Sequence, residues 1–236
     1  MEQLQSYQEQ LKDLGPLEIL QWALVEFGTD NLTIASSMGV EDQFLTHLAS
    51  KLETPCRLFF LDTGRHFQET YDCLQKSMDS YGVTYDIYGP EAGDIEKMVT
   101  ENGPNLFYKS VELRKICCGI RKVKPLQRAL TGKAAWVTGL RQEQSVTRVG
   151  LEPIEWDEAH GLYKINPLHD WSLERLWEVV RSEEVVIHAL HEQGFPSIGC
   201  QPCTRAISAG EDLRAGRWWW EEPEHKECGL HNRPTK

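Results

Sequence analysis

The sequence has no long hydrophobic run and no excess of positive charge, and each absence excludes a class of protein. No stretch of about 18 apolar residues occurs, which excludes a transmembrane helix. The 236 residues include 25 Lys and Arg but 36 Asp and Glu, a net charge of −11. Such an acidic chain repels nucleic-acid phosphates and anionic lipids. We therefore expect neither nucleic acid nor a membrane as a partner.

The sequence also lacks a signal peptide, internal repeats and low-complexity blocks. Its first 15 residues, MEQLQSYQEQLKDLG, are polar and acidic, without a charged segment followed by an apolar one. We therefore expect a cytoplasmic protein whose seven cysteines stay reduced. Because 40% of the residues are hydrophobic and 26% charged, the chain has the composition of a folded protein.

Short apolar segments alternate with helical patterns along the chain. The expected strands cover residues 31–36, 56–61, 83–88 and 134–139, and the expected helices cover 41–52, 66–80, 121–130 and 171–181. This alternation is typical of βαβ units. It predicts an α/β fold, a Rossmann-like, mostly parallel sheet flanked by helices. In such sheets ligands bind beyond the carboxyl ends of the strands.

Three segments are expected along the chain. Residues 1–28 are predicted to form N-terminal helices that pack on the core. Residues 29–217 are predicted to form the α/β domain. Residues 218–236 are polar and follow a stretch dense in Gly, Pro and Cys, so we expect a mobile C-terminal tail.

Four of the cysteines form two tight pairs. Cys117 and Cys118 are adjacent, and Cys200-Gln-Pro-Cys203 begins 82 residues after Cys118. Two such pairs predict a metal site, and zinc is the first alternative. Paired zinc ligands are usually separated by a few residues, however, whereas adjacent cysteines can each reach a different iron of a cluster. The pattern therefore favours a 4Fe-4S cluster.

A fifth cysteine, Cys228, stands alone near the C-terminus, in the stretch Lys226-Glu-Cys-Gly-Leu-His231. A lone cysteine is most often an inert structural residue. A polar, mobile location is unlike that of a core thiol, however, and a thiol there can reach a cleft and then a second protein. For Cys56 and Cys73, in a predicted strand and a predicted helix, we expect a structural role.

Two predicted turns and a set of basic residues point to an anionic ligand. Ser36–Asp42 and Leu61–Gly64 follow the first two strands, where backbone amides and hydroxyls can approach an anion. Arginine forks suit phosphate and sulfate oxygens. The basic residues near these motifs are Arg121, Lys122, Arg141, Arg148, Arg214 and Arg217.

Together these motifs resemble the assimilatory sulfonucleotide reductases, specifically the cluster-bearing adenylyl-sulfate (APS) reductases. The matching stretches are Ser36–Asp42, Leu61–Gly64, Cys117–Lys122, Thr138–Arg141, Gly199–Cys203 and Lys226–His231. The resemblance implies an adenine-nucleotide α-hydrolase-like fold. It also implies an oxidoreductase of sulfate assimilation and cysteine biosynthesis that reduces APS to sulfite and AMP. Reduced thioredoxin, or a glutaredoxin, would be the electron donor.

The resemblance also implies roles for single residues. Cys228 would be the nucleophile that forms an S-sulfocysteine intermediate, and Cys117, Cys118, Cys200 and Cys203 would bind one 4Fe-4S cluster. The implied substrate-binding residues are Ser36, Ser37, Gly39, Leu61, Asp62, Thr63, Gly64, Lys122, Gly139, Arg141, Arg148, Arg214, Arg217 and His231. One position departs from the family pattern, since Met38 stands where a second serine is expected. The sequence leaves homo-oligomer formation open.

Three alternatives stay open at this point. A reductase of 3′-phosphoadenylyl sulfate (PAPS), or one with dual specificity, is the nearest, although members restricted to PAPS generally lack the two cysteine pairs. An ATP-dependent PP-loop thiolase or ligase would call for a Ser-Gly-Gly-x-Asp-Ser loop, which Ser36–Asp42 does not supply. A redox-sensing cluster protein without catalysis would leave Cys228 and the arginines without a purpose.

Overall fold

The computed structural model describes residues 2–144, 150–222 and 230, and these form two compact units. Unit 1 comprises Met1–Phe60, Glu69–Asp86 and Gly132–His188, and unit 2 comprises Leu61–Gln68, Ile87–Thr131 and Ala189–Lys236. The boundaries predicted after residues 28 and 217 do not coincide with this division. The N-terminal helices belong to the same unit as most of the sheet.

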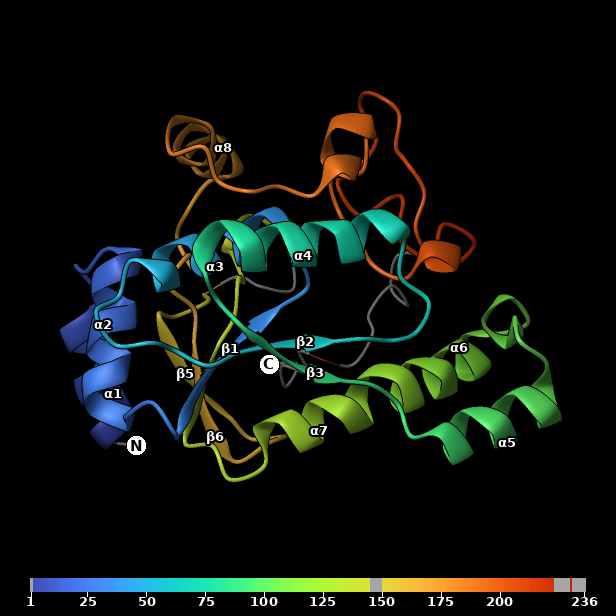
Figure 1. Ribbon diagram of the computed structural model, residues 1–236, viewed down its shortest axis with the longest axis horizontal. Coiled ribbons are helices and arrows are strands. Elements are labelled where there is room, and N and C mark those ends of the chain that lie inside the picture. The colour runs from blue at the N-terminus through green and yellow to red at the C-terminus, as the bar shows by residue number, and fades with distance from the viewer. Residues whose placement is uncertain (1, 145–149, 223–229, 231–236) are drawn as a thin grey trace. The chain divides into compact units, whose positions relative to one another are not determined.

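A six-stranded sheet has the order β3-β2-β1-β4-β6-β5 (Figure 1). Its strands are β1 (Leu32–Ser36), β2 (Leu58–Leu61), β3 (Tyr85–Tyr88), β4 (Ala135–Val137), β5 (Ile154–Asp157) and β6 (Leu162–Ile165). β1 pairs in parallel with β2 and β4, and β4 with β6, whereas β5 and β6 are antiparallel. The predicted mostly parallel sheet is therefore confirmed, while β5 and β6 are additions that the sequence did not predict.

Helices surround this framework in chain order. In unit 1 they are α1 (Glu2–Leu11), α2 (Pro16–Phe27), α3 (Val40–Ser50), α4 (Gln68–Tyr81, apart from its first residue) and α8 (Leu173–Ser182). In unit 2 they are α5 (Ala92–Asn102), α6 (Val111–Cys118) and α7 (Lys124–Leu130). The helices predicted at 41–52, 66–80 and 171–181 are confirmed within a few residues. No described helix is long and apolar enough to cross a membrane.

Each unit buries a hydrophobic cluster of its own. In unit 1 the central strands supply Leu32, Ile34, Ala135 and Val137, none of which exposes any surface. These apolar runs are the reason that the strands could be predicted. In unit 2 the cluster is smaller. Among the described residues it consists of Met98, Leu106, Phe107, Cys117, Cys118, Cys203 and Trp218.

The strand order reverses at β1. The chain passes from β1 to β2 and β3 on one side, and β4, β6 and β5 lie on the other side. Because β1 and β4 are parallel neighbours, the loops that follow Ser36 and Val137 emerge at the same edge of unit 1. In open α/β sheets such a switch point is the usual place for a ligand.

Candidate functional site: a cysteine-lined cationic pocket

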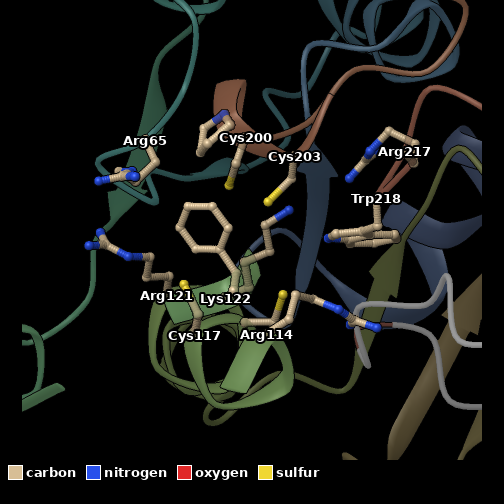
Figure 2. A pocket seen from close by; sticks show the side chains of 12 residues that line it. Arg65, Arg114, Cys117, Arg121, Lys122, Cys200, Cys203, Arg217 and Trp218 are labelled. Atoms are coloured by element: carbon tan, nitrogen blue, oxygen red, sulfur yellow. The ribbon is translucent and has the colours of Figure 1, made fainter. Parts of the chain in front are cut away.

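The two cysteine pairs line one pocket of unit 2 (Figure 2). Cys117 and Cys118 end helix α6, whereas Cys200 and Cys203 belong to the 3-10 turn Gln201–Cys203 and its cap. All except the half-buried Cys200 are buried. The pocket contains about 390 Å³ of space not filled by atoms, part of it open solvent. Folding thus brings the two pairs to one place despite their separation in sequence.

An unusual turn of helix follows the first pair. Helix α6 begins at a serine cap, where the Ser110 hydroxyl accepts a hydrogen bond from the Leu113 amide at 3.2 Å. After Cys118 the helix widens into a π-helical turn over Gly119–Val123 before α7 starts. Such π turns are rare, and they occur frequently at functional sites. This turn carries the basic residues Arg121 and Lys122 next to the thiols.

The wall of the pocket is cationic although the protein is acidic. Its basic residues are Arg65, Arg114, Arg121, Lys122 and Arg217. The sequence predicted Arg121, Lys122 and Arg217 but missed Arg65 and Arg114. Arg65 directly follows the predicted Leu61–Gly64 turn, and Arg114 lies one helical turn before Cys118. Proximity to these motifs is the signal that could have identified both.

The burial of the thiols changes how readily they ionise. Desolvation, followed by the neighbouring Cys200 and Cys118, raises the pKa of Cys203 to about 12. Desolvation also raises the pKa of Cys117, whereas Arg121 opposes this shift. A thiol must lose its proton to bind a metal, so the cations of the wall favour the ligating form.

The arrangement of donors distinguishes between a cluster and a single ion. A zinc ion draws its thiolates to about 2.3 Å from one point. In the described part of the chain, no three His, Cys, Asp or Glu side chains gather so as to hold one metal ion. A cluster instead spreads its thiolates over several irons. Four thiols around one cationic pocket therefore fit a 4Fe-4S cluster better than a zinc ion.

The end of the described chain packs into the same pocket. Trp218 lies between two guanidinium groups, those of Arg114 and Arg217, each 4.7 Å from its ring. Arg114 is fully buried and forms a two-pronged ion pair with Glu221, with N–O distances of 3.0 and 2.8 Å. The sequence assigned Trp218 no functional role, and its burial confirms packing. The structure adds that this packing builds the pocket wall.

The predicted turn Leu61–Gly64 borders the cysteines within unit 2. The Thr63 hydroxyl lies 3.2 Å from the sulfur of Cys200, and the Thr63 carbonyl accepts a hydrogen bond from Arg121 at 2.6 Å. The Asp62 carboxylate accepts from the Gly64 amide at 2.8 Å. Gly64 has a φ of 65°, a conformation that favours glycine.

The predicted loop Ser36–Gly39 lies in unit 1 at the end of β1. The exposed Ser37 donates its hydroxyl to Asp42 at 2.6 Å, and its amide donates to the same oxygen at 2.7 Å. Met38 is completely buried and has a φ of 63°. The residue that departs from the family pattern therefore packs in the core of unit 1. Gly39 caps helix α3.

Four other predicted residues lie away from the cysteine pocket or outside the described residues. Arg141 is buried in unit 1, where its side chain contacts other protein groups. Arg214 belongs to unit 2 but is not among the residues that line the pocket. Arg148, Cys228 and His231 fall outside the described residues.

The fold and the pocket define an α/β protein with a thiol-rich, cationic site. A model of the phosphoadenosine phosphosulfate reductase domain matches residues 31–206, and the chain belongs to this family. It is 49% identical over 222 residues to an adenosine 5′-phosphosulfate reductase of Allochromatium vinosum, covering 94% of this chain and 86% of the relative. For the enzyme of the same name from Burkholderia cepacia the identity is 48%, covering 91% and 87%.

Solved structures agree with this assignment. The chain is similar to a PAPS reductase from Candida auris in complex with phosphate, with a TM-score of 0.75 and 30% identity over 88% of this chain and 97% of the other. An FMN adenylyltransferase from Candida glabrata has a TM-score of 0.58 at 17% identity, covering 99% of this chain and 77% of the other, which shows similarity of fold alone. These similarities confirm the predicted adenine-nucleotide α-hydrolase-like fold.

Proposed function

We propose that this protein is a cytoplasmic, thioredoxin-dependent APS reductase of sulfate assimilation. It converts adenosine 5′-phosphosulfate to sulfite and AMP, and it carries one 4Fe-4S cluster on Cys117, Cys118, Cys200 and Cys203. One observation carries the proposal: these four thiols and five cations line a single pocket, in a chain 45–49% identical to several proteins named adenosine 5′-phosphosulfate reductase.

The first step is a nucleophilic displacement at sulfur. The Cys228 thiolate attacks the sulfur of the sulfonyl group, a sulfur–sulfur bond forms, and the sulfur–oxygen bond to the nucleotide breaks. AMP leaves with the bonding electron pair, and the enzyme holds an S-sulfocysteine. AMP is a weakly basic leaving group, so the step needs positive charge near the breaking bond more than it needs a proton donor.

The second step regenerates the enzyme. One thiolate of reduced thioredoxin attacks the Cys228 sulfur, and sulfite leaves with the electron pair of the broken sulfur–sulfur bond. The second thiol of thioredoxin then attacks the mixed disulfide, which frees Cys228 and leaves thioredoxin oxidised. Two electrons from the two thiols thus reduce the transferred sulfonyl group to sulfite.

The cationic residues of unit 2 are suited to hold the phosphosulfate. Lys122 and Arg217 line the pocket, and in Figure 2 the Lys122 side chain points toward Cys203. Cations at this position would stabilise the charge that develops on the leaving phosphate. When bound, the cluster supplies structural support and a local electrostatic field. The chemistry requires no electron from it.

PAPS is the second candidate substrate. The similarity to the Candida auris PAPS reductase favours it, as does the name of the matching family model. The two substrates differ by a 3′-phosphate, so this alternative leaves the chemistry at Cys228 unchanged.

Thioredoxin-coupled sulfite release from anaerobically purified protein tests the proposal. We expect strong turnover of APS, little turnover of PAPS, and complete loss of sulfite in Cys228→Ser. Cys56→Ser is the matched control, because Cys56 is not among the residues lining the pocket, and it should retain activity. Equal or faster turnover of PAPS would transfer the assignment to the second candidate. No sulfite from either substrate, with the iron content intact, would overturn the proposal.

A further inference from the structure

Two carboxylates at the start of α3 reach the two loops that meet at the switch point of unit 1. Asp42 accepts hydrogen bonds from the amide and hydroxyl of Ser37 and from the Gly139 amide. A β-carbon placed on Gly139 would lie 2.5 Å from the Asp42 carboxylate and 2.8 Å from the β-carbon of Glu41. The loop after β4 therefore approaches α3 as closely as a residue without a side chain allows.

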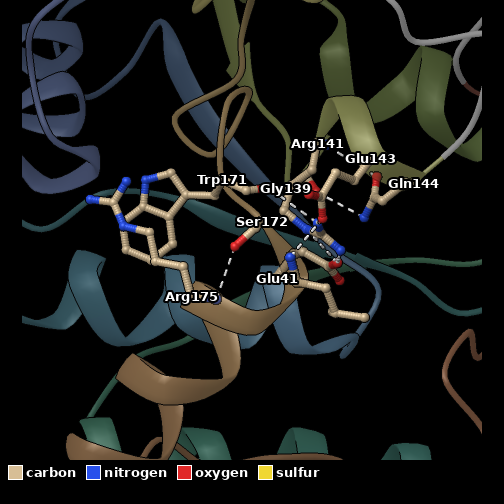
Figure 3. A network of polar contacts seen from close by, with 9 residues as sticks. Glu41, Gly139, Arg141, Glu143, Gln144, Trp171, Ser172 and Arg175 are labelled. Carbon is tan, nitrogen blue, oxygen red and sulfur yellow. Dashed lines mark hydrogen bonds and ion pairs between the residues drawn. The ribbon is translucent and has the colours of Figure 1, made fainter.

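Glu41 holds the same loop through Arg141 (Figure 3). One oxygen of Glu41 accepts from two nitrogens of the guanidinium, Nε at 3.0 Å and Nη2 at 2.9 Å. The Nη1 nitrogen donates to the Trp171 carbonyl at 3.2 Å and to Glu143 at 3.4 Å. Only 1% of the Arg141 side chain is exposed. This guanidinium is thus enclosed by acceptors of the protein itself.

The contacts continue from Arg141 into the start of helix α8. Glu143 accepts from the Leu173 amide at 2.8 Å, in the first turn of that helix. The Arg141 amide donates to Gln144, whose side chain donates back to the Gly139 carbonyl. One network therefore ties residues 139–144 to α3 and α8. Its residues directly precede Arg148, which is predicted to bind substrate.

We propose that Arg141 is a positioning residue for the nucleotide site and not a ligand of the anion. Through Glu41 it fixes the loop after β4 against α3. The loop can then present Gly139 and the residues that follow Gln144 to the nucleotide. Ser37 acts in the same way, because its hydroxyl is donated to Asp42. This inference rests on the proposed function, since it concerns binding of the nucleotide part of APS.

The two roles predict different losses of affinity. A direct anion ligand matters for AMP but not for adenosine, which has no phosphate. A residue that positions the loop matters equally for both. We therefore compare Arg141→Gln and Glu41→Gln, measuring the dissociation constants of AMP and adenosine by calorimetry. We expect each variant to bind both compounds at least tenfold more weakly, by similar factors. The double variant should be no worse than the weaker single one, because the residues act as a pair.

Further variants separate positioning from a loss of folding. Arg141→Lys keeps the charge, but one ammonium group cannot reach Glu41 and the Trp171 carbonyl with the same geometry. We therefore expect it to lose affinity as Arg141→Gln does. Arg57→Gln is the matched control, because Arg57 is a half-exposed arginine of the same unit, and it should bind normally. The iron content, carried by unit 2, should stay unchanged in all variants.

Three results would contradict these expectations. A loss in Arg141→Gln that is tenfold larger for AMP than for adenosine would make Arg141 an anion ligand, as would near-normal AMP binding by Arg141→Lys. Unchanged affinity in Glu41→Gln would show that the pair does not position the loop. Wild-type protein that binds neither compound would overturn the proposed function itself, and this proposal with it.

Discussion

The two units differ in how they use buried polar and ionisable groups. In unit 1 the carboxylates Glu41 and Asp42 and the guanidinium of Arg141 bond to one another's loops beneath a large hydrophobic cluster. In unit 2 the cysteines themselves make up three of the seven fully buried members of the described hydrophobic cluster. The comparison suggests that unit 1 is stabilised by its own side chains, whereas a bound group would complete the core of unit 2.

The largest expected effect tests that difference directly. Cys203→Ser should lose most of its iron and all sulfite production, because the variant removes one of the four proposed thiolate ligands. Amide hydrogen exchange should then accelerate in α6 and α7 of unit 2, while the central strands β1 and β4 keep their protection. The control Cys56→Ser should match the wild type. Equal loss of protection in both units would end the distinction between them.

The second prediction concerns the buried pair of unit 2. Glu221→Gln leaves the fully buried Arg114 without its counter-charge. Removing one partner of a buried ion pair typically costs about 3–5 kcal/mol. The matched control is Glu211→Gln, since the Arg205–Glu211 pair has the same 2.8 Å separation but is partly exposed. That change should cost about 0–1 kcal/mol. Denaturant unfolding of both variants measures the two values, and similar costs would contradict the argument.

The third prediction is a pH dependence that arises in unit 1. Desolvation raises the pKa of Asp42 from 3.8 to about 6, the Ser37 hydrogen bonds opposing the shift. The folded state therefore binds more protons than the unfolded state between these values, so Asp42 lowers stability as the pH rises from about 4 to 6. A difference of about 2 pKa units corresponds to about 3 kcal/mol.

The variant Asp42→Asn isolates this contribution. The stability of wild-type protein relative to Asp42→Asn should fall by about 3 kcal/mol between pH 4 and pH 6.5, and stay constant above that. Urea unfolding at several pH values measures it. A difference that does not change with pH would show that the carboxyl titrates normally in the folded protein.

The parts of the fold that could be predicted are those that bury a continuous apolar run. Strands β1 and β4 occupy the centre of the sheet and were found on that basis. Strand β5 lies at the edge, where exposed and buried residues mix within four positions, and it was missed. Helix α5 was also missed, because it buries only Met98 and shows no apolar stripe. In both cases tertiary contacts, and not local pattern, stabilise the element.

The site divides in the same way. The cysteine pairs could be predicted because their spacing within the sequence carries the signal. Arg114 and Trp218 could not, since their place in the pocket depends on contacts between segments about 100 residues apart. Arg141 was assigned to the anion because a sequence does not show that Glu41, exactly as distant in the chain, already accepts from its guanidinium.

The smallest expected effect tests the close approach of loops in unit 1. Gly139→Ala places a methyl group against Asp42 and Glu41, and overpacking of this kind costs about 1–3 kcal/mol. Gly93→Ala is the matched control, because Gly93 lies in helix α5 with open space around it. Alanine there should be neutral or stabilise the helix by up to about 1 kcal/mol. Thermal unfolding compares the two, and AMP affinity should fall only in Gly139→Ala. If both variants behave alike, the loop has room to move, and the rigidity that distinguishes unit 1 does not extend to its ligand-facing edge.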